Sequence, residues 1–191
     1  MHIALTVFVI LLFSASLSCI FSPKTGKKDS QPVGQWVEPT TPRKVINNLQ
    51  VSFNLRDIDF YERCLHENYF YRSPSDIDSL DLYWSRSEDV QTVGNIMRGC
   101  REFIFNSSEI NIYEEYGKNV PDKPDGAKLD ENDEHPDEIW YICAYYITMD
   151  IFTLNFGDFK VQQDMIFKMV ENPETHLFSI IRWVDLNPLI Q

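Results

Sequence analysis

The hydrophobic pattern of this chain changes its period near residue 100. Before that point apolar residues recur at helical spacing, whereas after it they lie in runs that are typical of strands. Helices that precede a series of antiparallel strands indicate the α+β class, in which the helices gather on one face of a sheet. The 191 residues suffice for one sizeable core and a small extra segment.

Three helices are predicted in the first half of the chain. Thr41 offers a capping hydroxyl to a first helix that begins with Pro42. The other two helices begin with capping boxes, in which an aspartate or serine stands three residues before a glutamate. The predicted helices span residues 41–56, 59–68 and 85–99, and an aromatic strand at 69–72 follows the second.

Longer strands are predicted after the third helix, at residues 103–113, 139–156, 159–170 and 177–184. In the strand at 139–156, alternation places Tyr145, Ile147 and Met149 on the more continuously apolar face, which we expect to meet the helices. The opposite face is expected to point outward. Because large exposed apolar patches generally mark interfaces, it supplies five interface candidates: Trp140, Ile142, Tyr146, Phe152 and Leu154.

Acidic residues dominate the segment 122–138, where eight acidic and two basic side chains predict a solvated loop. Calcium is the alternative, but the acidic residues lack the alternate spacing and the sixth-position glycine of a calcium loop. No metal and no other cofactor is predicted. Over the whole chain, 29 acidic against 17 basic residues give a net charge of -12, which disfavours a nucleic-acid partner.

The N-terminus carries the features of an export signal. Residues 1–18 combine a long apolar run with small residues and no charged side chain, as in a signal peptide. Cys19 stands where a bacterial lipoprotein signal places the lipidated cysteine, and residues 19–39 suit a flexible tether. We expect a lipid anchor at the bacterial cell envelope, with an ordinary cleaved signal or an uncleaved membrane anchor as alternatives. Three other cysteines are interpreted as buried hydrophobic residues, or as one disulfide and a leftover thiol: Cys64, Cys100 and Cys143.

Three stretches of the sequence resemble the nuclear transport factor 2-like superfamily. "TTPRKVINNLQVSFNLRDIDFYERCLHENYFYRSP" is similar to its opening, in which a proline-initiated helix and a short helix lead into an aromatic first strand. "YWSRSEDVQTVGNIM" and "LFSIIRWVD" are similar to the third helix and the terminal strand of uncharacterised bacterial lipoproteins with this domain. The resemblance covers residues 40–188 and implies a cystatin-like α+β cone, in which a curved, antiparallel-rich sheet folds over three helices around a pocket.

The resemblance also directs attention to acids and histidines inside the cone, because enzymes of this superfamily use them for proton transfer. Ser73 stands where the isomerases place an aspartate, and the histidines at 66, 135 and 176 are expected at the surface. Asp150 is the candidate base within the long strand, although alternation points it outward. Four aromatic residues are expected to line the cavity: Tyr69, Tyr71, Trp84 and Tyr145.

These observations lead to one preferred function and two alternatives. The preferred function is that of a lipid-anchored, non-catalytic domain that binds a small apolar ligand or a protein partner at the cell envelope. The alternatives are a small isomerase, dehydratase or cyclase that acts on an apolar substrate, and an assembly or scaffold subunit with a filled cavity. A titratable side chain at the cavity floor favours the enzyme. The resemblance further implies that two copies pair through the outer face of the sheet.

Overall fold

The computed structural model describes residues 34–73 and 82–185 of the chain. The predicted signal peptide, Cys19 and most of the predicted tether therefore lie outside the described residues. Within the two described ranges, no helix is both long and apolar enough to cross a membrane.

Three helices precede the long strands: α2 (Pro42–Leu55), α3 (Ile58–Arg63) and α4 (Arg86–Gly99). The side chain of Thr41 caps α2 as predicted, by accepting a hydrogen bond from the Lys44 amide. The chain leaves α2 at Arg56, which adopts the left-handed conformation with φ of 56°. The capping box of α4 is also present, because Glu88 accepts hydrogen bonds from the amide and the hydroxyl of Ser85.

The short helix α3 differs from its prediction at both ends. Asp57 caps it by accepting a hydrogen bond from the Phe60 amide, so the predicted start at Asp59 is wrong by two residues. Residues 66–68, which were expected to end this helix, already belong to the first strand. An earlier cap and the pairing of that strand with its neighbours outweigh the local helix signals.

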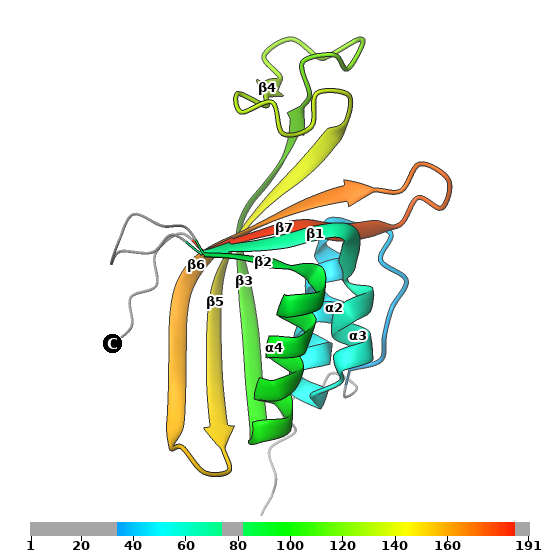
Figure 1. Ribbon diagram of the computed structural model, residues 1–191. Helices are drawn as coiled ribbons and strands as arrows, with labels where there is room; N and C mark the ends of the chain where they lie inside the picture. The colour runs from blue at the N-terminus through cyan, green and yellow to red at the C-terminus, as the bar shows by residue number, and fades with distance from the viewer. Residues whose placement is uncertain (1–33, 74–81, 186–191) are drawn as a thin grey trace, which may run out of the picture. The chain divides into compact units, whose positions relative to one another are not determined.

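Seven strands form one mixed sheet: β1 (Leu65–Ser73), β2 (Leu82–Ser85), β3 (Cys100–Tyr116), β4 (Lys128–Leu129), β5 (Ile139–Thr153), β6 (Asp158–Glu171) and β7 (Phe178–Asp185). Their order is β2-β1-β7-β6-β5-β3-β4 (Figure 1). Strand β1 runs parallel to β7 and β4 runs parallel to β3, while the long strands β3, β5, β6 and β7 pair antiparallel. The predicted α+β class and its antiparallel-rich sheet are confirmed.

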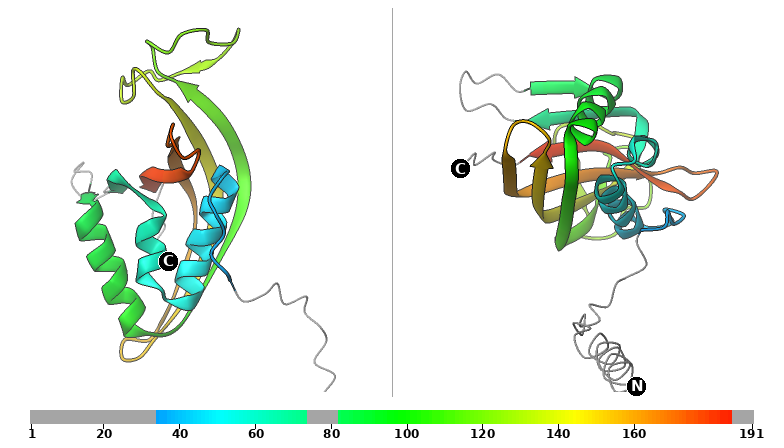
Figure 2. Two further views of the ribbon diagram at one scale, coloured as in Figure 1. Left: turned by 90° about the vertical axis from the view of Figure 1, so that its right-hand side faces the viewer. Right: turned by 90° about the horizontal axis from the view of Figure 1, so that it is seen from below.

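The sheet curves around the helices, which lie on its concave side (Figure 2). The pairing of β3 with β5 shifts register twice, and the pairing of β6 with β7 shifts once. Such irregularities bend strands and increase their twist, which accounts for the curvature. The structure therefore has the cone that the resemblance implies.

Strand β5 divides its side chains between two faces as alternation predicts. Tyr145, Ile147 and Met149 lie in the core beneath the helices. Asp150 lies on the convex face, where its carboxylate oxygen is 3.5 Å from the Lys160 ammonium. Its predicted outward orientation is confirmed.

The acidic segment between β3 and β5 folds back onto the convex face. Gly117 permits this turn, because a Cβ there would lie 2.0 Å from the carbonyl oxygen of His135. The ring of His135 then stacks on the indole of Trp140, with centroids 4.3 Å apart. His135 and Asp130 are buried, so the prediction of a wholly solvated loop, and of a surface position for His135, is wrong.

The same loop changes the predicted interface surface. Trp140 is 2% exposed and Ile142 is 3% exposed, so the expected exposure of these two residues is wrong. They form a small second core with Ile181, against which Tyr113, Ile166 and Val170 pack. Tyr146 and Leu154 remain exposed, at 40% and 61%.

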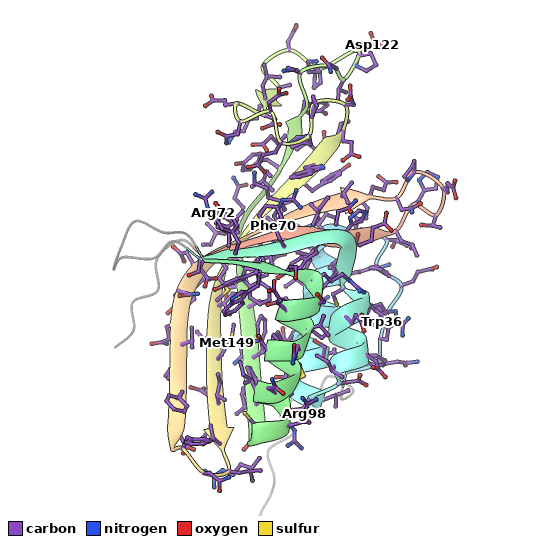
Figure 3. All side chains as sticks on the ribbon, in the orientation of Figure 1. Trp36, Phe70, Arg72, Arg98, Asp122 and Met149 are labelled. Carbon is purple, nitrogen blue, oxygen red and sulfur yellow. The ribbon has the colours of Figure 1, made fainter. Side chains whose placement is uncertain are left out.

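Residues 34–39 pack against the helices rather than leaving the domain. The amide and the carbonyl of Val37 bond to the side chain of Asn48 at 3.0 and 2.7 Å. The indole of Trp36 packs on the Phe60 ring, and the Arg63 guanidinium lies 4.0 Å from the Trp36 ring centroid (Figure 3). The packed domain thus begins before the boundary predicted at residue 40.

Candidate functional site

A cavity of about 240 Å³ lies between the helices and the concave face of the sheet. Figure 3 labels one of its wall residues, Met149, which belongs to β5. The walls are mainly apolar and include Phe53, Val93, Phe103, Met149, Val161 and Met165. Since an apolar cavity of about 150 Å³ can hold benzene, this cavity accommodates a molecule with one ring.

Asp89 brings a carboxyl group to the cavity from the first turn of α4. Its side chain is buried and accepts a hydrogen bond from the hydroxyl of Tyr61, a residue of α3. Burial raises the pKa of Asp89, hydrogen bonding from Tyr61 and Tyr69 lowers it in part, and the charge of Asp185 raises it further. The cavity therefore favours the protonated form of this acid more than water does.

Asp185 brings a second carboxyl group, from the C-terminal end of β7. The hydroxyl of Tyr71 donates a hydrogen bond to its Oδ2 atom, because the parallel pairing of β1 with β7 places the two strands side by side. Burial raises the pKa of Asp185, and hydrogen bonding from Tyr71 lowers it in part. Two acids whose ionisation is disfavoured thus share one small cavity.

Three buried polar atoms near these acids make no well-aligned hydrogen bond within the described residues: Tyr69 Oη, Trp183 Nε1 and Asp185 Oδ1. Tyr69 nevertheless lies close enough to Asp89 to lower the pKa of that acid by hydrogen bonding. Gln163 and Trp183 also lie close enough to Asp185 to lower the pKa of that acid by hydrogen bonding, although Trp183 Nε1 makes no well-aligned hydrogen bond. Buried polar groups are almost always partnered in folded proteins. These atoms therefore mark where a bound molecule can donate or accept hydrogen bonds.

Two of the four predicted cavity residues line the cavity, and the other two do not. Tyr71 and Trp84 line the cavity, and their rings stack with centroids 4.9 Å apart. Tyr69 is buried beside the cavity wall and contributes a hydroxyl that makes no well-aligned hydrogen bond. Tyr145 lies elsewhere in the core, where its hydroxyl donates a hydrogen bond to Glu109 at 3.3 Å.

Sequence reasoning missed both cavity acids, although each has a local signal. Asp89 stands four residues before Val93, on the apolar face of α4 that also carries Met97. Asp185 stands two residues after Trp183 and so shares its face of β7. An acid within an otherwise apolar face is the pattern that identifies such residues.

Among the described residues, no histidine or cysteine lines the cavity. The three described cysteines are free and buried, as predicted, and burial raises the pKa of Cys64 and of Cys143 to about 12. Such thiols are unreactive, so the cavity chemistry rests on the two acids.

No protein-family model matches the sequence, and no curated protein does either. Solved structures do match. A conserved protein from Planctomyces limnophilus is 6% identical with a TM-score of 0.54, and the match covers 75% of this chain and 90% of that one. A candidate scytalone dehydratase from Novosphingobium aromaticivorans is 10% identical with a TM-score of 0.52, over 78% and 91% of the two chains. A ketosteroid isomerase-like protein from Erwinia carotovora atroseptica is 9% identical with a TM-score of 0.50, over 76% and 94%.

These likenesses concern the fold of the chain. The described residues form the curved sheet and three helices of the nuclear transport factor 2-like proteins. Identity at this level shows the fold alone. The chemistry has to be argued from the cavity itself.

Proposed function

We propose that this chain binds a small apolar molecule with one ring in the cone cavity and transfers a proton to or from it. The observation that carries this proposal is the Oδ1 atom of Asp185, which is buried in a mainly apolar cavity and accepts no well-aligned hydrogen bond, although Gln163 and Trp183 lie near the carboxyl group. A carboxylate whose pKa is raised by burial is a stronger base than an ordinary aspartate, which suits it to general acid–base catalysis near neutral pH.

The side chains around Asp185 suggest which groups would assist the proton transfer. Tyr71 holds the Oδ2 atom, so Oδ1 is left to accept a proton from the bound molecule. The indole N–H of Trp183, which makes no well-aligned hydrogen bond, can donate to an oxygen atom of the molecule, where charge develops as the proton leaves. Asp89, held by Tyr61, serves as a second acid that stays protonated more readily than in water.

Exchange of hydrogen for deuterium tests this function directly. With full-length chain in D2O, proton NMR follows the loss of the α-proton signals of cyclohexanone, a one-ring carbon acid. We expect the chain to accelerate this exchange and Asp185→Asn to abolish the acceleration. Asp150→Asn, on the convex face, is the matched control and should exchange like the natural sequence.

Two other outcomes lead to different conclusions. Binding of cyclohexanone without exchange, seen as saturation transfer from the protein, would contradict catalysis and favour a non-catalytic carrier. Absence of both binding and exchange across a panel of one-ring ketones and phenols would overturn the proposal. The cavity of about 240 Å³ already argues against a scaffold whose cone is filled by its own side chains.

The cellular location of the chain and its oligomeric state are also proposals. A lipid anchor at Cys19 would hold the domain at a bacterial cell envelope, and mass spectrometry of the mature N-terminus tests it. The exposed residues Tyr146 and Leu154, with the half-buried Phe152, would join two copies. Leu154→Asp should then convert a dimer to a monomer in sedimentation experiments.

A further inference from the structure

The convex face carries a second cluster of titratable groups, which the proposed function does not use. Glu115 ends β3, and Asp130 and His135 come from the loop that folds over Trp140. The His135 side chain is 0% exposed and that of Asp130 is 1% exposed. One ligand atom from each of the three residues lies within 4.8 Å of the others.

The hydrogen bonds of His135 leave one of its ring nitrogens facing carboxylates. Its Nδ1 atom lies 3.1 Å from the carbonyl oxygen of Glu138. A carbonyl oxygen accepts hydrogen bonds, so Nδ1 carries the proton. In the neutral ring Nε2 then presents a lone pair, 3.0 Å from Glu115 Oε1 and 3.9 Å from Asp130 Oδ2. Lone pairs at this distance repel each other unless a cation lies between them.

We propose that Glu115, Asp130 and His135 bind a zinc ion that fastens the acidic loop to the sheet. One imidazole nitrogen and two carboxylate oxygens form a donor set that zinc accepts. Tetrahedral zinc with bonds of about 2.0–2.1 Å separates its ligand atoms by about 3.3 Å, and the distances of 3.0 and 3.9 Å from Nε2 bracket that value. The Nδ1 contact to a carbonyl is the arrangement that orients most metal-binding histidines.

The charge around the cluster also favours a divalent cation. The Asp130 carboxylate accepts hydrogen bonds from the backbone amides of Asn132 at 3.1 Å and His135 at 2.8 Å, which stabilise its charged form. Lys168 is the nearest ammonium, and it bonds to Glu134 at 2.9 Å while staying 3.9 Å from Glu115. Arg182 is a second cation that interacts with Glu134. The carboxylates of Glu115, Asp130 and Glu134 therefore exceed these two cations by one negative charge.

Calorimetric titration of Zn²⁺ into the untagged full-length chain tests the site. We expect one ion per chain, a change in tryptophan fluorescence from Trp140, and a rise in melting temperature with added zinc. His135→Gln and Glu115→Gln should each weaken binding at least tenfold. His176→Gln, at an exposed histidine paired with Glu171, is the matched control and should bind like the natural sequence.

Two results would overturn the inference. The first is a chain that shows no saturable zinc binding, in which case a proton on Nε2 makes the contacts instead. The second is undiminished zinc binding by Glu115→Gln. Because Glu115 lies at the accessible side of the cluster, this variant should remain folded even if His135→Gln does not.

Discussion

The pKa of buried acids is shifted in opposite directions on the concave and the convex side of the sheet. On the concave face, Asp89 and Asp185 receive hydrogen bonds from tyrosine hydroxyls, and burial raises the pKa of both. On the convex face, Asp130 receives backbone amides and lies beside His135, and its pKa is lowered. Similar side chains on the two sides of the sheet therefore differ in acidity, because the pKa is raised on the concave side and lowered on the convex side.

The difference shows which neighbours decide the state of a buried carboxyl group. Neutral hydroxyl donors do not offset the loss of hydration, so the concave acids are weakly acidic and suited to exchange protons. Backbone amide donors together with a nearby imidazole do offset it, so the convex acid gives up its proton more readily and is suited to hold a loop. The concave acids are therefore expected to lower the stability of the folded chain while making proton transfer possible, and the convex acid is expected to raise its stability.

The largest effect is expected from removing the anchor of the convex loop. Trp140→Ala should lower the free energy of unfolding by about 3–5 kcal/mol, because a buried indole and its stack on His135 are lost. Urea unfolding measures this change. Tyr146→Ala, on the same face of the strand but exposed, is the control and should change stability little. Equal losses in the two variants would mean that the loop is not anchored there.

Asp185→Asn should change activity and stability in opposite directions. We expect a loss of about 100-fold in proton exchange, together with a gain in stability at pH 7. Because the folded state raises the pKa of Asp185, its acid stabilises folding at low pH and loses that contribution as the pH rises through the folded pKa.

The stability difference between Asp185→Asn and the natural sequence should therefore grow as the pH rises above about 4. Urea unfolding between pH 3 and 7 measures it. A difference that shrinks over this range would show that Asp185 is stabilised as a carboxylate, which would remove the contrast with the convex face.

Asp130→Asn should have the opposite sign at pH 7. Loss of a charged acceptor for two backbone amides is expected to lower the free energy of unfolding by about 1–3 kcal/mol. The measurement is urea unfolding with a chelator present, so that metal does not contribute. Asp125→Asn, in the exposed part of the same loop, is the control and should behave like the natural sequence.

Tyr71→Phe sharpens the comparison by removing one hydroxyl while keeping the ring that stacks on Trp84. We expect a loss of about 1 kcal/mol and a further rise in the pKa of Asp185. Carbon NMR of the Asp185 carboxyl group against pH measures that rise. An unchanged titration would show that burial alone sets the acidity of this group.

The smallest effect is expected at Asp150. Its pairing with Lys160 is partly exposed to solvent, so Asp150→Asn should change the free energy of unfolding by less than about 0.5 kcal/mol. Urea unfolding and the exchange assay measure this. A large fall in exchange would place the base on the convex face and would contradict the assignment of Asp185.

Local patterns in the sequence predicted much of the fold. Capping residues located α2 and α4, and alternation along β5 identified which side chains meet the helices. Tyr71 and Trp84 were predicted as cavity residues and line the cavity. Trp140 and Ile142 were predicted to be exposed, because alternation says which face a residue occupies and not whether another segment covers that face.

The sequence by itself determined the elements and their faces, since helix caps, hydrophobic period and strand alternation act between neighbours along the chain. Tertiary structure alone decided the chemistry of the acids. Asp89 and Asp185 are 96 positions apart in the printed sequence and meet because α4 packs against a curved sheet. Whether a carboxyl group is ionised depends on the hydration that it loses and on the donors that replace water, and those donors come from distant parts of the chain.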